Sequence, residues 1–185
     1  MLNPIAEFDR TLSLWVHGQA QPWLDAAMKP ITRGGDWHTL WLVTIACSAF
    51  FLLWHRRKRE PALLLLACSL SSLLNPLLKL FFQRERPQLW ATIIPHPSDF
   101  SFPSGHAMSA MTVYGLAALL LARLHPQQRW ILWLSAAVVI ALIGFSRVYL
   151  GVHWATDVLA GFMAGSVLVY ASIFLTRRLD RRNAE

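Results

Sequence analysis

Six ionisable residues stand at the ends of long apolar segments and supply three cations, two imidazoles and one carboxylate. They are Lys79, Arg86, His106, Arg147, His153 and Asp157. Each has an ordinary structural explanation alone: a lysine or arginine anchors a helix end, and a His–Asp pair at i and i+4 shares a hydrogen bond. Charged groups at the ends of membrane-spanning helices are costly unless they are paired or used. Because alternation of the segments brings all six to one face, we interpret them together as a functional site.

The three cations suit a phosphate group. A dianionic phosphate is matched by Lys79, Arg86 and Arg147, and an arginine can bind two phosphate oxygens at once. Ser104 and Gly105 open a predicted helix, where backbone amides add donors at the positive end of the helix dipole. Gly105 lets the backbone approach a ligand closely, although an ordinary turn with Ser104 as N-cap explains the same residues. The predicted phosphate ligands are Lys79, Arg86, Ser104, Gly105 and Arg147.

The two histidines divide the remaining work of phosphoryl transfer. One imidazole must attack phosphorus, and the other must protonate the leaving oxygen. Asp157 lies one helical turn after His153, so its carboxylate can orient that imidazole and stabilise the charge that develops on it. We therefore predict His153 as the nucleophile, Asp157 as its partner and His106 as the general acid. Metal binding by these three residues is the alternative, but three nearby cations repel a divalent ion, so no metal or other cofactor is predicted.

Long charge-free segments carry these residues. Hydrophobic residues make up 55% of the 185 residues and charged residues only 15%, against about 25% charged in a soluble domain. Lys, Arg, Asp and Glu are absent from segments 37–55, 61–78, 100–122, 130–146 and 158–176, and a helix of roughly 17 to 25 residues spans a bilayer. The third helix is expected over 107–124, because residues 102–105 are typical of a turn. The predicted fold is an all-α polytopic membrane bundle of about five transmembrane helices.

Residues 1–36 are predicted to be an N-terminal amphipathic segment ahead of a membrane domain at 37–185. Ile5, Phe8, Leu12 and Trp15 recur at helical spacing. A signal peptide is not indicated, since the basic start, the unbroken apolar core and the cleavage site are missing. Prolines and glycines between residues 18 and 35 interrupt the pattern, so one or two short helices in the membrane interface are expected. A sixth, re-entrant span is the alternative.

The distribution of basic residues predicts the orientation, because cytoplasmic loops are enriched in Lys and Arg. With the basic loop 55–59 inside, ten of the 17 Lys and Arg fall on the cytoplasmic side and seven outside, and three of those seven are site residues. The formal charge of +7 is thus explained by contact with a membrane surface, and no nucleic-acid partner is predicted. We expect a bacterial inner (cytoplasmic) membrane protein whose site faces the periplasm or outside.

Three short motifs contain the candidate site residues. Residues 79–87 read K-x6-R-P, residues 103–106 read P-S-G-H, and residues 146–157 read S-R-x5-H-x3-D. In this order they resemble the signature motifs of the type 2 phosphatidic acid phosphatase family, lipid phosphate phosphatases that share a fold with vanadium haloperoxidases and class A acid phosphatases. The resemblance covers residues from about 60 to 170. It implies a helical core, metal-independent hydrolysis through a phosphohistidine, and the residue roles given above, with His106 also binding phosphate.

The expected substrate is a lipid phosphate held in the bilayer. The loop 88–102 is apolar and aromatic, and it can dip into the bilayer and admit a lipid tail, although an interfacial anchor explains it as well. Its apolar residues include Trp90, Ile93, Ile94, Pro95, Phe100 and Phe102. The small size of the chain and the outward-facing site favour undecaprenyl diphosphate. Phosphatidylglycerophosphate, phosphatidic acid and lipid A phosphates are the alternatives.

Other functions and assemblies are weighed against this interpretation. A lipid phosphotransferase uses the same intermediate and stays open, whereas a transporter predicts polar residues at mid-depth that the spans nearly lack, and a lipid-embedded site disfavours a haloperoxidase. Gly161 and Gly165 form G-x-x-x-G, which favours packing against another helix of the same chain over a dimer seam. No oligomeric state is predicted. Cys47 and Cys68 lie in apolar segments, so no disulfide is predicted.

Overall fold

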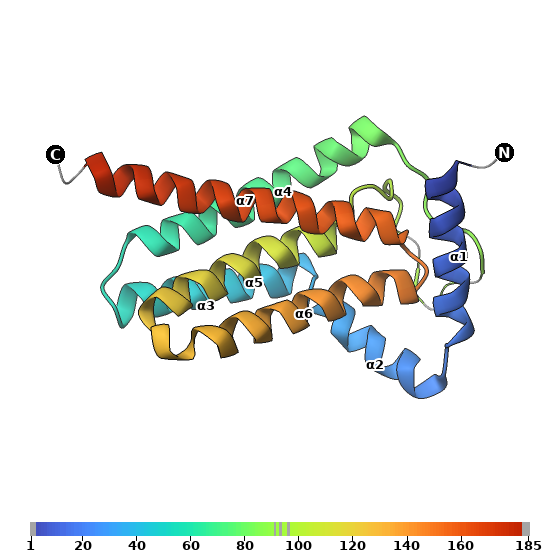
Figure 1. The fold of residues 1–185 in the computed structure, drawn as a ribbon, viewed down its shortest axis with the longest axis horizontal. Coiled ribbons are helices and arrows are strands. Elements are labelled where there is room, and N and C mark those ends of the chain that lie inside the picture. Colours follow the sequence, from blue (N-terminus) through green and yellow to red (C-terminus); the bar gives the residue numbers. More distant parts are fainter. Residues whose placement is uncertain (1–2, 91, 93, 96, 183–185) are drawn as a thin grey trace.

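The structure, a computed structural model, is all-helical over the residues it describes, which are 3–90, 92, 94–95 and 97–182. Its helices are α1 (Pro4–Gly18), α2 (Pro22–Arg33), α3 (Trp37–Leu53), α4 (Arg59–Phe82), α5 (Gly105–Leu124), the short 3₁₀ helix η1 (Pro126–Gln128), α6 (Arg129–Tyr149) and α7 (Ala155–Arg182). The long helices run side by side along the molecule, and α1 crosses one end of the bundle (Figure 1). The predicted all-α membrane bundle is confirmed.

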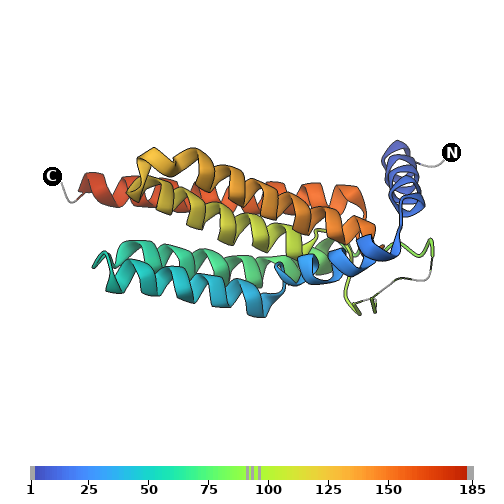
Figure 2. The same ribbon diagram turned by 90° about the horizontal axis from the view of Figure 1, so that it is seen from below.

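The bundle has two layers, with α3 and α4 in one and α5, α6 and α7 in the other (Figure 2). Helix α5 lies at the centre, since it packs against α3, α4, α6 and α7. Gly161 and Gly165 of α7 face α5: a Cβ on Gly161 would lie 2.6 Å from the Ser104 carbonyl oxygen, and one on Gly165 would lie 2.5 Å from the Met108 carbonyl oxygen. The predicted packing of this G-x-x-x-G pair within the chain is confirmed.

Four helical segments are long and apolar enough to cross a membrane, namely Arg59–Phe82, Gly105–Leu124, Pro126–Tyr149 and Ala155–Leu175. Helix α3 has only 17 residues, and it qualifies only together with α2, from which it is bent by 53°. Large apolar side chains are exposed along these helices, for example Leu73, Phe81, Ile131 and Met163, as expected of surfaces that face lipid. The described residues thus contain four or five candidate spans.

Near the site, helices α4 and α6 extend beyond the charge-free segments from which they were predicted. Helix α4 continues past residue 78 to Phe82, and α6 continues past residue 146 to Tyr149. A charge-free criterion stops at the first charged residue, whereas Lys79 and Arg147 are buried within their helices, 6% and 4% exposed. Helix α5 begins at Gly105, two residues before the predicted start. The charged residues are therefore positioned by regular helix.

Helix α1 turns its polar side toward the protein. Asp9 and Ser13 are buried, while Ile5, Phe8 and Trp15 are more than half exposed. The expected amphipathic helix is present, and its apolar face is free to contact lipid. Its contacts with α6 and α7 bring it beside the site residues of the bundle end.

Candidate active site

One cavity of about 310 Å³ brings together most of the predicted site residues. Its lining includes Lys79, Arg86, Gly105, His106, Arg147 and His153. The other two predicted residues, Ser104 and Asp157, are fully buried, and they meet where the Ser104 backbone N–H donates to the Asp157 carbonyl oxygen over 3.0 Å. That bond ties the start of α5 to the start of α7. The site therefore lies at the end of the bundle that α1 crosses (Figure 1).

A carboxylate from the loop after α4 pairs with two of the predicted phosphate ligands. Asp99 forms ion pairs with Lys79 and with Arg86, the latter at 2.5 Å between Arg86 Nη2 and Asp99 Oδ1. Arg86 Nε also donates to the Asp99 carbonyl oxygen over 2.9 Å. Burial raises the pKa of Asp99, but Lys79 and Arg86 outweigh that effect and hold it below its usual value. Asp99 is thus an anion paired with two of the cations that the sequence predicts as phosphate ligands.

Arg147 and Ser104 offer buried polar atoms without a hydrogen-bond partner among the described residues. The Arg147 guanidinium donates from Nη1 to Thr32 Oγ1 over 2.7 Å, but its Nε has no partner, and neither does Ser104 Oγ. Buried polar groups are normally hydrogen-bonded, so unpaired ones point to a missing ligand or water. Both atoms therefore have unused hydrogen-bonding capacity next to the cavity, although Ser104 does not line it.

His153 is held as a neutral imidazole with its Nε2 as acceptor. Arg86 Nη1 donates to His153 Nε2 over 3.2 Å, so the ring proton lies on Nδ1, because a guanidinium can only donate. Nδ1 faces Ser101 Oγ at 3.3 Å and Asp157 Oδ2 at 3.5 Å. Burial first, and then the positive charges of Arg147, Arg86 and Lys79, lower the pKa of His153 well below its usual value. Nε2 is therefore unprotonated at neutral pH, and its lone pair accepts from Arg86.

Ser101 stands between His153 and Asp157. Its hydroxyl donates to Asp157 Oδ2 over 2.5 Å, and it lies closer to His153 Nδ1 than the carboxylate does. The Trp154 backbone N–H donates to the same oxygen over 2.9 Å. The i,i+4 spacing predicts the pairing of His153 with Asp157, but it contains no sign of the serine.

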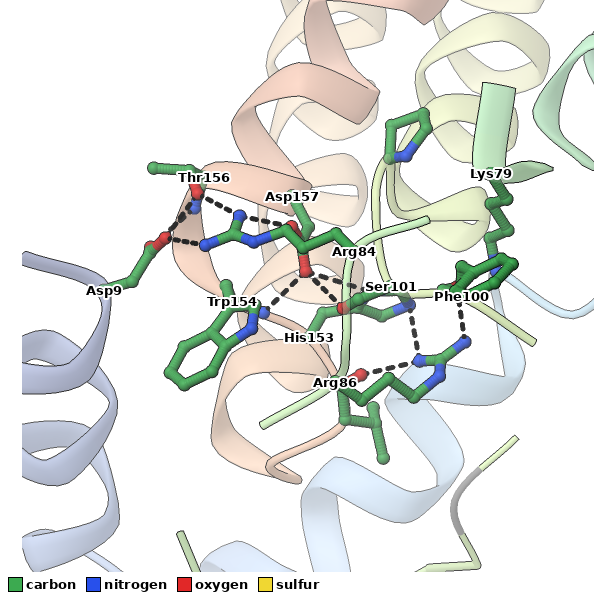
Figure 3. Close-up of polar contacts among 12 residues, drawn as sticks. Asp9, Lys79, Arg84, Arg86, Phe100, Ser101, His153, Trp154, Thr156 and Asp157 are labelled. Carbon is green, nitrogen blue, oxygen red and sulfur yellow. Dashed lines mark hydrogen bonds and ion pairs between the residues drawn. The ribbon is translucent and has the colours of Figure 1, made fainter. Parts of the chain in front are cut away.

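Arg84 links the other oxygen of Asp157 to helix α1 (Figure 3). Its Nη1 lies 2.6 Å from Asp157 Oδ1, and its Nη2 lies 2.6 Å from Asp9 Oδ2. Asp9 also accepts from the Thr156 backbone N–H over 3.0 Å and from the Thr156 hydroxyl. The N-terminal helix thus contributes a buried charge to the network that fixes Asp157, a contact that the sequence analysis missed.

His106, the second residue of α5, bonds to a carboxylate from the junction of α2 and α3. Its Nε2 lies 2.9 Å from Asp36 Oδ1, and the His106 side chain is 23% exposed. Gly105 beside it lines the cavity, but the space that a Cβ would take is occupied by Asn75, whose Oδ1 would lie 2.8 Å away. The small size of Gly105 therefore serves the packing of α4 on α5 as well as access to the cavity.

The loop 88–102 is fastened to α1 at one of its aromatic residues. Trp90 stacks on His17 with ring centroids 4.0 Å apart and planes 9° apart, and Ile94 packs against the apolar core next to α1. Ile93 lies outside the described residues. Trp90 therefore packs on protein instead of projecting freely toward a bilayer.

Several site residues carry no sequence pattern that reveals them. Asp99 and Ser101 lie in an irregular loop, and Arg84 occupies an unspecified position of the K-x6-R-P motif. Asp9 and Asp36 lie outside the motifs. Among the described residues, no group of three or more His, Cys, Asp or Glu is arranged to hold a metal ion. The site is thus a set of cations, histidines and orienting carboxylates.

Comparison with known proteins places this arrangement in a family. Residues 60–181 match the PAP2 superfamily. The chain is 36% identical over 184 residues to phosphatidylglycerophosphatase B of Bacillus subtilis, covering 97% of this chain and 87% of that protein. It is 34% identical to undecaprenyl-diphosphatase of Sulfolobus acidocaldarius, covering 71% of this chain and 62% of that one.

The fold agrees with a solved structure as well. The crystal structure of a transmembrane PAP2-type phosphatidylglycerolphosphate phosphatase from Bacillus subtilis matches with a TM-score of 0.90 at 33% identity, covering 96% of this chain and 88% of that one. The family match extends over most of the bundle and includes all three motifs. This chain therefore belongs to the PAP2 superfamily and is a membrane lipid phosphatase of that type.

Proposed function

We propose that this chain hydrolyses the phosphate or diphosphate of a membrane lipid without a metal, at the non-cytoplasmic face, through a phosphohistidine at His153. The observation that carries the proposal is the state of His153: a buried, neutral ring whose Nε2 accepts from Arg86 while its Nδ1 faces Ser101 and Asp157. This is the tautomer that a nitrogen nucleophile needs.

In the first step the substrate phosphate replaces the Asp99 carboxylate on Lys79 and Arg86. Arg147 Nε and Ser104 Oγ bind its remaining oxygens. Arg86 Nη1 moves from His153 Nε2 to a phosphate oxygen, and Nε2 then forms a bond to phosphorus as the bond from phosphorus to the leaving oxygen breaks. His106 gives that oxygen a proton, and Asp157 stabilises the positive charge on the His153 ring. Charge stabilisation by fixed donors supplies most of the catalysis in this class of reaction.

In the second step water releases the phosphate. The water oxygen attacks phosphorus, the bond to His153 Nε2 breaks, and His106 takes the water proton. A lipid or sugar hydroxyl in place of water gives the phosphotransferase alternative. A labelled donor incubated with the candidate acceptor distinguishes the two, because only a transferase yields labelled acceptor.

Two substrates have specific support. Undecaprenyl diphosphate is favoured by the small chain and the outward-facing site, and one relative bears that activity in its name. Phosphatidylglycerophosphate is the second candidate, because the relative that covers 97% of the chain is named for it. Phosphatidic acid and lipid A phosphates complete the set to be tested.

The purified protein should release phosphate from at least one of these lipids in detergent, and EDTA should leave the rate unchanged. The reason is that the cavity contains fixed cations where a metal-dependent phosphatase has a carboxylate cage. The measurement is phosphate release across the lipid panel with and without EDTA. Activity that EDTA abolishes and a divalent metal restores would refute the proposal.

The site is proposed to face outward, on the support of the basic-residue bias. In a chain carrying Cys47→Ala and Cys68→Ala, we expect Ser98→Cys to react with a membrane-impermeant thiol reagent in intact cells and Arg57→Cys to react only in inverted vesicles. Ser98 lies in the loop beside the site and Arg57 in the basic loop before α4. The reverse labelling pattern would overturn the orientation.

A further inference from the structure

The junction of α2 and α3 lines the cavity with Gly35 and Asp36. A Cβ on Gly35 would lie 2.8 Å from His106 Cδ2 and 2.8 Å from Ile143 Cγ2, so the backbone at Gly35 approaches the His106 ring more closely than any other residue type allows. The Tyr114 hydroxyl donates to the Gly34 carbonyl oxygen over 2.8 Å. Together with the bond from Arg147 to Thr32, these contacts fix the junction against α5 and α6.

Asp36 occupies a helix-capping position without capping the helix. It is the N-cap residue of α3, but its side chain makes no bond to the backbone of that helix. N-cap carboxylates ordinarily accept a backbone N–H from the second or third helical residue. Here Asp36 Oδ1 meets His106 Nε2 at 2.9 Å instead. The carboxylate is therefore committed to the histidine.

This contact settles which nitrogen of His106 carries a proton in the neutral ring. A carboxylate can only accept, so Nε2 donates to Asp36 and Nδ1 is the nitrogen that gains and loses a proton. The Cδ2–Nε2 edge of the ring lies against Gly35 and Asp36, and no second hydrogen bond to His106 is found among the described residues. Lys79 and Arg147 also act on this ring as positive charges, and Asp36 is the carboxylate that offsets them.

We infer that Asp36 is the positioning residue of the general acid, holding His106 so that Nδ1 delivers the proton to the leaving oxygen and later accepts one from water. The inference rests on the proposed function. In the first step the Nδ1–H bond breaks, its proton goes to the leaving oxygen, and Nε2–H stays bonded to Asp36; in the second step Nδ1 regains a proton from water. The site thus contains two carboxylate–histidine pairs, Asp157 with the nucleophile and Asp36 with the acid.

The test is to measure kcat and KM of Asp36→Asn on two substrates that differ in leaving group. The leaving group of a lipid monoester such as phosphatidic acid is the diacylglycerol alkoxide, which needs a proton from the acid. The leaving group of farnesyl diphosphate is farnesyl phosphate, which needs that proton less. Since Asp36 is 43% exposed and its charge is partly screened, we expect kcat on phosphatidic acid to fall on the order of 10 to 10²-fold, which is part of the 10² to 10⁴ that general acid catalysis supplies. The fall on farnesyl diphosphate should be clearly smaller, and KM should change little on either substrate.

Three further variants make the result specific. Asp36→Glu should restore much of the kcat on phosphatidic acid, because the carboxylate is retained. In a His106→Ala background, Asp36→Asn should have no further effect, since a residue that acts through another loses its effect when the other is removed. Asp25→Asn is the matched control: it removes a carboxylate from α2 that accepts from the Tyr149 hydroxyl, and it should leave both activities unchanged.

An equal loss on both substrates, a rise in activity, or an additive effect in the His106→Ala background would overturn the inference while leaving the proposed function intact. Failure of the unsubstituted protein to hydrolyse any lipid of the panel given under the proposed function would instead refute that function.

Discussion

His153→Ala should abolish turnover and leave no acid-labile phosphoenzyme. Loss of a covalent nucleophile costs on the order of 10⁶ in rate, and the described residues offer no other neutral nitrogen that accepts from Arg86. Rapid quench with ³²P-labelled substrate measures the intermediate directly. The ring is 2% exposed, so removing it leaves a buried hole, and the folded state of the variant should be checked by its thermal transition in detergent.

Asp157→Asn supplies a matched comparison for the nucleophile. An amide retains the shape of the carboxylate and its oxygen still accepts from Ser101 and the Trp154 backbone, but it loses the bond from Arg84 and carries no charge to stabilise the phosphorylated ring. Substrate binding should stay nearly intact while phosphoenzyme formation slows. If labelled phosphoenzyme can be trapped in His153→Ala, His153 is not the nucleophile.

The sequence predicted the helical bundle because composition and charge-free length report directly on a membrane. It also singled out Lys79, Arg86, His106, Arg147, His153 and Asp157 as candidates, since each is a charged or titratable residue at the end of an apolar segment, where such groups are unexpected. The structure brings most of them to one cavity. Residues that stand out against an apolar background can thus be found without coordinates.

The partners of these residues could not be predicted in the same way. Asp9 and Arg84 are 75 residues apart, and Asp36 and His106 are 70 apart; nothing in the spacing links them. Asp9, Arg84 and Asp36 lie in or next to polar stretches, where a charged side chain is ordinarily explained by exposure to solvent. Asp9 occupied the polar side of an amphipathic helix, and only the packing of α1 across the bundle shows that this side is buried.

The contacts of the loop between the first two motifs could not be predicted either. Its aromatic residues suggested contact with lipid, whereas the contacts of this region with the candidate site come from Arg84, Asp99 and Ser101, three polar residues that follow no period. A loop has no repeating geometry that assigns each side chain to a face, so the sequence cannot say which of its polar groups turn inward. The contact of Asp99 with Lys79 and Arg86, two predicted phosphate ligands, became visible only in three dimensions.

His106→Ala should lower the rate on lipid monoesters by about 10² to 10⁴, the contribution of a general acid, while leaving His153 able to accept phosphate. The reason is that, in the proposed mechanism, His106 donates to the leaving oxygen and His153 alone bonds to phosphorus. With farnesyl diphosphate, whose leaving group needs less protonation, the loss should be smaller and labelled phosphoenzyme should still form. Because His106 also takes the proton from water, the intermediate should break down slowly and accumulate to a higher level than in the unsubstituted protein.

Rapid-quench measurements on both substrates test this expectation alongside His153→Ala. The Asp25→Asn variant, whose substitution lies on α2 outside the cavity lining, again serves as the control for handling and detergent. If His106→Ala forms no phosphoenzyme from farnesyl diphosphate while His153→Ala does, the two histidines have the opposite roles. If His106→Ala loses the same factor on both substrates, the residue binds phosphate without acting as the acid, and the leaving-group argument for Asp36 fails with it.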